Sequence, residues 1–114
     1  TSDFSDAGGK IRYLRGDATR CRYPDGHFGA VTCLSVIEHG LPLEAFFREM
    51  RRVLKPGGTF LFNAWDRIEE NEFADVVTTA LQTLFATDPP RFLARTPHGY
   101  HDVAKIAAAA SESF

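Results

Sequence analysis

The stretch that decides the fold is Phe28-Gly29-Ala30-Val31-Thr32-Cys33-Leu34-Ser35-Val36-Ile37, which leaves almost no polar face. Such a run is typical of a strand buried on both sides, as in a parallel sheet. A helix is predicted at 42–54, because apolar side chains recur there at helical spacing and Pro56-Gly57-Gly58 stops it. A second buried strand is predicted at 59–65. Strand, helix and strand in this order predict an α/β fold with parallel strands.

The other predicted elements flank this unit. They are a lead-in loop at 1–10, a half-exposed edge strand at 11–15, an amphipathic helix at 73–85, a loop at 91–101 and an alanine-rich helix at 103–110. A chain of 114 residues is long enough for one domain rather than two. We therefore expect a single domain over residues 1–114.

Composition excludes several classes of function. A net charge of −2 shows no basic excess, so a nucleic-acid partner is not expected. Two cysteines are too few for a disulfide framework, and Cys33 is interpreted as a small buried hydrophobe. The sequence has neither an apolar run of membrane-helix length nor a signal peptide, so we expect a cytoplasmic protein with no membrane partner. Arg48, Arg51, Arg52 and Lys55 are interpreted as a solvated helix face in preference to a phosphate-binding surface.

Polar residues follow each predicted strand. In open α/β sheets, ligands bind beyond the carboxyl ends of the strands. That rule selects three strand tips, at Gly16-Asp17-Ala18, Ser35–His39 and Asn63–Arg67. We expect these tips to converge on one crevice.

Four segments in order carry a family resemblance: Gly16–Ala18, Tyr23–Phe28, Val31–His39 and Leu54-Lys55-Pro56-Gly57-Gly58. The series resembles the motifs of class I S-adenosylmethionine-dependent methyltransferases, in the small-molecule branch that includes the quinone-biosynthesis type. The match covers about residues 11 to 65. It implies a partial Rossmann-like methyltransferase fold, with a short, mostly parallel sheet and flanking helices. It also implies methyl transfer from S-adenosylmethionine to a small-molecule acceptor.

The resemblance assigns cofactor roles to four residues. The Asp17 carboxylate would accept a hydrogen bond from the adenine amino group, and the Ala18 backbone N–H would donate to a ring nitrogen. Ser35 and Val36 would lie beside the sulfonium and the amino-acid part of the cofactor. Two alternatives stay open: Asp17 begins a turn, and Ser35 bonds local backbone.

The resemblance also suggests residues on the acceptor side. His39 is the candidate general base, because imidazole titrates near neutrality. In the quinone O-methyltransferases that the sequence resembles, two acids and a histidine can hold a divalent ion here, but Ser35 occupies the place of one acid, so no metal is expected. The alternative is that Glu38 and His39 are exposed loop residues. Asp66, His98 and Tyr100 are expected to face the acceptor. The alternative for Tyr100 is that it anchors its loop to the core. Trp65 is interpreted as a core residue.

The sequence departs from the family at its start. It has neither the family's glycine-rich turn nor the following strand that ends in a ribose-binding acid, which predicts a truncated domain with impaired activity. By analogy the sheet would have a gap between strands 11–15 and 28–37. These strands could pair directly, a longer protein could fill the gap, or two copies could pair or swap elements. We favour the intermolecular solution, a homodimer or element-swapped oligomer, and its functional alternative is a non-catalytic homodimeric interaction module.

Overall fold

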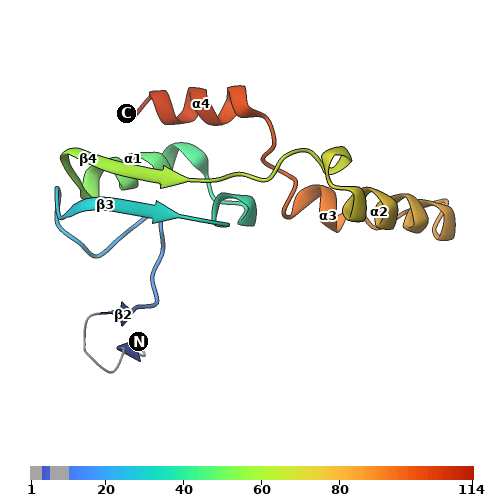
Figure 1. Ribbon diagram of the computed structural model, residues 1–114, viewed down its shortest axis with the longest axis horizontal. Coiled ribbons are helices and arrows are strands. Elements are labelled where there is room, and N and C mark those ends of the chain that lie inside the picture. The colour runs from blue at the N-terminus through green and yellow to red at the C-terminus, as the bar shows by residue number, and fades with distance from the viewer. Residues whose placement is uncertain (1–3, 6–10) are drawn as a thin grey trace.

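The computed structural model describes residues 4–5 and 11–114 (Figure 1). In chain order its elements are β1 (Phe4–Ser5), β2 (Arg12–Tyr13), β3 (Phe28–Cys33), the 3₁₀ helix η1 (Ile37–His39), α1 (Leu43–Val53), β4 (Leu54–Phe62), the 3₁₀ helix η2 (Ile68–Glu70), α2 (Glu72–Leu84), α3 (Phe92–Arg95) and α4 (Val103–Ser111). Helix α1 connects the two strands of a parallel pair, β3 and β4, and further helices follow, which confirms the α/β class.

The central unit is β3–α1–β4, and its two strands are parallel. Pairing runs from Phe28 opposite Leu54 directly to Ala30 opposite Thr59, so residues 55–58 bulge out of the ladder. Gly57 takes a left-handed φ of 75° in this bulge. At Gly58, a Cβ would lie 2.9 Å from the Gly29 carbonyl oxygen, so only glycine fits. The Pro-Gly-Gly motif therefore ends α1 and turns the chain, as predicted, although β4 formally begins before it.

The core lies between α1 and one face of this sheet. The side chains of Phe46 and Phe47 on α1 are fully buried, and Met50 is nearly so. They pack in one cluster with residues from the sheet and from α4: Val31, Cys33, Phe60, Phe62, Ile106 and Ala109. The ring of Phe114 stacks on that of Phe60 at a centroid distance of 5.5 Å, which fixes the end of the chain on this core. The buried position of Cys33 confirms its interpretation as a small hydrophobe.

The opposite face of the sheet is open. Leu34 and Leu61 are 62% and 55% exposed, so the prediction that both strands are buried on both sides is wrong for this structure. Strand β3 is also shorter than the strand predicted at 28–37. It ends at Cys33, because Ser35 takes a left-handed φ of 54° and the chain then enters η1.

Strand β2 pairs antiparallel with β1, with Phe4 opposite Tyr13 and Ser5 opposite Arg12. Direct pairing of strand 11–15 with strand 28–37, one of the predicted alternatives, is therefore absent from the described residues. Strand β1 lies in the segment that was predicted to be a lead-in loop. The other residues of that loop, 1–3 and 6–10, lie outside the described part. Figure 1 shows this two-stranded arm extending away from the core.

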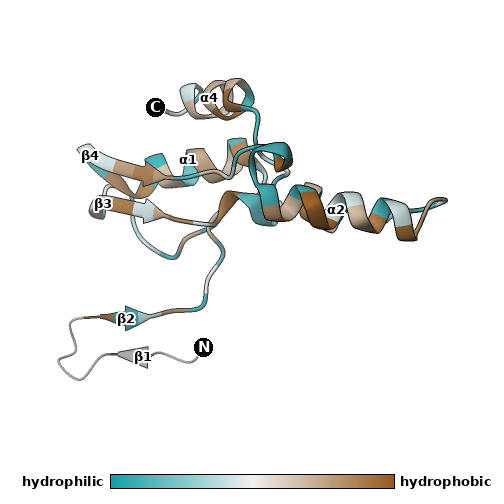
Figure 2. Cartoon of the chain, turned by 45° about the vertical axis from the view of Figure 1, so that its right-hand side comes forward, coloured by the Kyte–Doolittle hydropathy of each residue, from teal (hydrophilic) through white to brown (hydrophobic). Residues whose placement is uncertain are grey.

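Helix α2 extends away from the core at the end toward which β3 and β4 point (Figures 1 and 2). It begins where the Asn71 side chain accepts a hydrogen bond from the Ala74 backbone N–H, a standard N-cap. Phe73 and Leu84 on this helix are 77% and 75% exposed, and Figure 2 shows brown apolar patches along it. The predicted loop at 91–101 contains the short helix α3.

The described chain is elongated, with extents of 51 × 37 × 21 Å and a radius of gyration of 17.7 Å. A compact domain of this length would have a radius of gyration of about 13 Å. Among residues 4–5 and 11–114, none of the helices has both the length and the apolar character needed to cross a membrane.

Candidate active site

The tips of β3 and β4 are joined by a hydrogen bond. The backbone N–H of Ser35 donates to Oδ1 of Asn63 at 2.8 Å. Both strands are parallel, so both tips leave the sheet at its carboxyl edge. Ser35 is held in the left-handed region, which is unfavourable for residues other than glycine and is common at ligand-binding positions. Two of the three tips that the sequence selected are thus in contact.

Asp17 organises its own loop. Its Oδ1 accepts hydrogen bonds from the Thr19 backbone N–H at 2.8 Å and from the Thr19 hydroxyl at 2.7 Å. These bonds, the hydroxyl first, lower the pKa of the Asp17 carboxyl below its ordinary value. The turn interpretation of Asp17 is therefore confirmed. The same arrangement leaves Oδ2 without a hydrogen-bond partner among the described residues.

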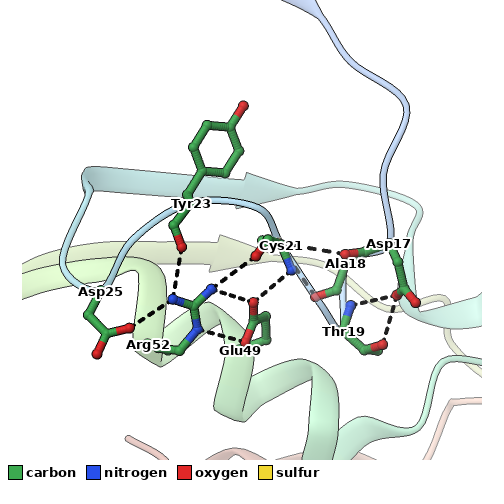
Figure 3. Close-up of polar contacts among 8 residues, drawn as sticks. All are labelled: Asp17, Ala18, Thr19, Cys21, Tyr23, Asp25, Glu49 and Arg52. Atoms are coloured by element: carbon green, nitrogen blue, oxygen red, sulfur yellow. Dashed lines mark hydrogen bonds and ion pairs between the residues drawn. The ribbon is translucent and has the colours of Figure 1, made fainter. Parts of the chain in front are cut away.

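A clamp of two α1 side chains holds the rest of this loop (Figure 3). The Arg52 guanidinium donates to the carbonyl oxygens of Tyr23 at 2.8 Å and Cys21 at 3.1 Å, and to the Asp25 carboxylate at 2.8 Å. Two further bonds, of 2.6 and 2.9 Å, join it to Glu49. Glu49 in turn accepts from the Cys21 backbone N–H at 2.7 Å. We call Arg52 and Glu49 the loop clamp.

The loop clamp was missed in the sequence, where Arg52 was assigned to a solvated face. That assignment is wrong for Arg52, although Arg48, Arg51 and Lys55 are exposed. The hydrogen bond from Arg52 lowers the pKa of Glu49, and the bonds to Glu49 and Asp25 raise the pKa of Arg52. The available signal was the spacing of Glu49 and Arg52, which puts opposite charges three residues apart on one helix face.

Ala18 follows Asp17 and packs against the core cluster that contains Cys33. Its backbone N–H makes no hydrogen bond among the described residues. A cavity of about 790 Å³ is lined by residues between 12 and 23, including Asp17 and Ala18. In Figure 3 Asp17 lies on the side toward which β3 and β4 point. No contact joins Asp17 to Ser35 or Asn63 in the described part of the chain, so the structure brings two of the three predicted tips into contact and leaves the first one separate.

The segment after Ser35 turns its side chains in different directions. Val36 packs partly buried against the core. Glu38 is only 3% exposed, so its interpretation as an exposed loop residue is wrong, whereas His39 is exposed as that interpretation had it. Within residues 4–5 and 11–114, no group of three or more metal-ligating side chains is found.

Residues that follow β4 contact Glu38 and the late loop. The Trp65 indole N–H donates to Oε1 of Glu38 at 3.1 Å. The Trp65 ring also meets the His98 ring edge-on, at a centroid distance of 5.6 Å. Nδ1 of His98 lies 2.7 Å from the Asp66 carbonyl oxygen. Trp65 is 40% exposed, so its interpretation as a core residue is wrong.

Tyr100 anchors the late loop. Its hydroxyl donates to the Leu41 carbonyl oxygen at 3.0 Å, and its ring packs against the core. The structural interpretation of Tyr100 is therefore confirmed. Asp66 is exposed, and its carboxylate accepts a hydrogen bond from the Arg67 backbone N–H. Of the three candidate acceptor residues, the structure brings Asp66 and His98 together, while Tyr100 contacts a different segment.

Comparison with known proteins gives the class. Residues 2–62, more than half of the chain, match the family model described as "Methyltransferase domain". The chain therefore belongs to the methyltransferase domain family. This membership confirms the resemblance to class I S-adenosylmethionine-dependent methyltransferases of the small-molecule branch.

Similar curated proteins include two fungal enzymes and one bacterial enzyme. The sterol 24-C-methyltransferase erg-4 of Neurospora crassa is 39% identical over 57 residues, which are 50% of this chain and 15% of that protein. The sterol 24-C-methyltransferase of Yarrowia lipolytica is 35% identical over 69 residues, 60% of this chain and 18% of that protein. The ubiquinone/menaquinone biosynthesis C-methyltransferase UbiE of Azotobacter vinelandii is 38% identical over 53 residues, 46% of this chain and 21% of that protein.

The chain thus spans about a fifth or less of the length of these curated relatives. No solved structure matches it.

Proposed function

We propose that this chain carries part of the binding site of an S-adenosylmethionine-dependent methyltransferase that acts on a small molecule. Asp17 and Ala18 hold the adenine, and Ser35 and Val36 lie beside the sulfonium end. The observation that carries this proposal is the 2.8 Å bond between Ser35 and Asn63, which brings the tips of two parallel strands together at the carboxyl edge.

The residues present fit the adenine end of the cofactor. One edge of adenine offers an amino donor beside a ring-nitrogen acceptor. Asp17 Oδ2 is an acceptor without a partner and the Ala18 N–H is a donor without one, among the described residues. The lowered pKa of Asp17 keeps the carboxylate ionised at neutral pH. The adjoining cavity of about 790 Å³ is within the range of small-molecule sites.

The residues of the chain act mainly by positioning. S-adenosylmethionine supplies a methyl group on a sulfonium, which is already a good leaving group. Holding the donor and the acceptor in line then supplies much of the rate. The loop clamp holds the loop that follows Asp17 and Ala18, and the Ser35–Asn63 bond holds the tips of β3 and β4 together. Asp66, His98 and Tyr100, with His39, are the candidates for contact with the acceptor.

The relatives suggest the kind of acceptor. Their names specify a sterol for two of them and ubiquinone and menaquinone biosynthesis for the third. We propose an acceptor of similar apolar character. Because the chain spans so little of those proteins, we propose that methyl transfer by this chain alone is impaired.

Calorimetric titration with S-adenosylhomocysteine tests the site. We expect saturable binding by the unaltered chain and a loss of affinity of about tenfold or more in Asp17→Ala, because a hydrogen bond to a charged group is lost. Asp88→Ala, which changes an exposed aspartate after α2, is the matched control and should bind normally. Absence of binding by the unaltered chain, or equal binding by Asp17→Ala, contradicts the proposal.

Self-association is a second proposal, favoured by exposed apolar surface. Phe73, Val76 and Leu84 on α2 are each at least 60% exposed, and β3 pairs with β4 alone among the described residues. Surfaces of this kind recruit partners. Light scattering coupled to a sizing column should give the mass of a dimer or larger species. A monomeric mass at micromolar concentration, with S-adenosylhomocysteine bound, contradicts the interaction-module alternative.

A further inference from the structure

The tautomer of His98 is fixed by its hydrogen bond. Nδ1 lies 2.7 Å from the carbonyl oxygen of Asp66, and a carbonyl oxygen can only accept. Nδ1 therefore carries a proton. In a neutral imidazole, Nε2 is then the unprotonated nitrogen, and its lone pair is free to accept a proton. Nε2 makes no hydrogen bond within the described part of the chain.

The His98 ring is held rigidly. The side chain is 3% exposed, and the ring of Trp65 packs against it edge-on. The His98 backbone N–H donates to the Leu93 carbonyl oxygen at 3.2 Å, and the His98 carbonyl oxygen accepts from Nδ1 of His101 at 2.9 Å. An imidazole with its Nδ1–H on a carbonyl and its orientation fixed is the usual arrangement of a histidine that acts through Nε2.

A second observation at the same place is a carboxylate oxygen without a partner. Oε2 of Glu38 is buried and makes no hydrogen bond among the described residues, while Oε1 accepts from Trp65. Buried polar atoms without partners are rare, and they often mark functional groups. The Trp65 indole contacts both Glu38 and His98, so a buried carboxylate lies in the same cluster as the imidazole.

His39, the candidate from the sequence, lacks these features. It is exposed, and its ring makes no hydrogen bond to a described residue. No contact with a described residue fixes its tautomer or orientation.

We propose that His98, in place of His39, is the general base, and that its Nε2 takes a proton from the methyl acceptor. This inference rests on the proposed methyltransferase function. The acceptor is then a molecule whose attacking atom bears a removable proton, such as a phenolic hydroxyl. The bond between the methyl carbon and sulfur breaks and its electron pair stays on sulfur. The bond between the acceptor oxygen and the methyl carbon forms, and the hydroxyl proton moves to Nε2. Three titratable residues lie around His98: Asp66, His101 and Glu38. Glu38 is linked to His98 indirectly, because Trp65 contacts both.

The first test is the tautomer, which needs no activity. Nitrogen-15 NMR of histidine-labelled chain distinguishes a protonated from an unprotonated Nε2. We expect the neutral imidazole of His98 to carry its proton on Nδ1. A proton on Nε2 in that neutral form overturns the proposal, whatever the chain binds or transfers.

The second test uses two probes that differ in one property. Phenol must lose a proton to be methylated, whereas thiocyanate has none to lose. In His98→Asn, the amide retains a donor for the Asp66 carbonyl oxygen but has no basic nitrogen. We expect this variant to lose transfer to phenol by about 100-fold or more and to keep transfer to thiocyanate. The acidic limb of the pH–rate profile with phenol should disappear in the same variant. His27→Asn, at an exposed histidine to which no site role is assigned, is the matched control and should leave both transfers unchanged.

The outcomes separate this inference from the function on which it rests. Unaltered transfer to phenol by His98→Asn, or equal loss with both probes, overturns the base role alone. Absence of transfer to either probe by the unaltered chain overturns the base role and contradicts the transfer activity, while calorimetry with S-adenosylhomocysteine still reports on the cofactor site.

Discussion

The backbone N–H of Ser35 donates to Oδ1 of Asn63 at 2.8 Å, and this bond links the ends of β3 and β4. The two residues are 28 positions apart in the chain and are brought together by the parallel pairing of the strands. The donor belongs to a residue with a φ of 54°. A strained backbone and a cross-strand bond thus occur together at the edge where α/β proteins bind ligands.

Replacing Ser35 by valine tests the left-handed backbone. A β-branched side chain is disfavoured at positive φ, so we expect Ser35→Val to lower the free energy of unfolding by about 1–2 kcal/mol. Urea denaturation measures this change. Ser35→Gly should not be destabilised in this way, because glycine adopts this φ without a steric penalty. Thr32→Val, at an exposed position of β3, is the control. Equal effects of Ser35→Val and Thr32→Val would show that Ser35 is not held at positive φ.

Removing Arg52 should release the loop that contains Tyr23 and Asp25. Arg52→Ala leaves the two carbonyl oxygens and the Glu49 carboxylate without their donor. We expect faster hydrogen exchange at the Cys21 amide and weaker binding of S-adenosylhomocysteine. Arg51→Ala, an exposed neighbour on α1, should change neither. Unchanged exchange at Cys21 in Arg52→Ala would show that the loop is held by other contacts.

The loop clamp also predicts a pH dependence. The hydrogen bond from Arg52 lowers the pKa of Glu49 in the folded chain below its unfolded value. A group of this kind stabilises the fold above the unfolded pKa, about 4.3 for glutamate, and loses that contribution as pH falls through the folded pKa. We expect exchange protection at the Cys21 amide to be full at neutral pH and to be lost below about pH 4. Protection that is lost between pH 8 and 6 would contradict this sign.

Trp65 and Glu38 give a prediction about buried hydrogen bonds. Trp65→Phe removes the donor to Oε1, which leaves both oxygens of the Glu38 carboxylate without a partner. We expect a loss of about 1–3 kcal/mol in the free energy of unfolding. The double variant Trp65→Phe with Glu38→Leu removes both partners and should be more stable than Trp65→Phe alone. If the double variant is the less stable of the two, the carboxylate does not depend on Trp65.

Sequence reasoning predicted the central unit and missed most of the site contacts, for identifiable reasons. The β3–α1–β4 unit was predictable because apolar periodicity and Pro-Gly-Gly act locally. The end of β3 was not predictable, because a serine in the sequence does not indicate a positive φ. The loop clamp could not be predicted without knowing which loop lies beside α1. Glu38 was assigned to the surface by its charge, and only the fold shows that Trp65 covers it.

The exposed sheet face has a similar explanation. The run 28–37 has the composition of a strand covered on both sides, but the described residues cover one side. Sequence composition indicates how much burial a strand can accommodate, whereas the structure shows which segments cover its faces.

The most direct test of the central claim is amide chemical-shift mapping during titration with S-adenosylhomocysteine. We predict that the amides of Ala18, Ser35 and Val36 shift together along one binding isotherm, because one ligand spans the tips of separate segments. Shifts confined to a single tip, or no shifts at saturating ligand, would contradict a shared adenosyl site.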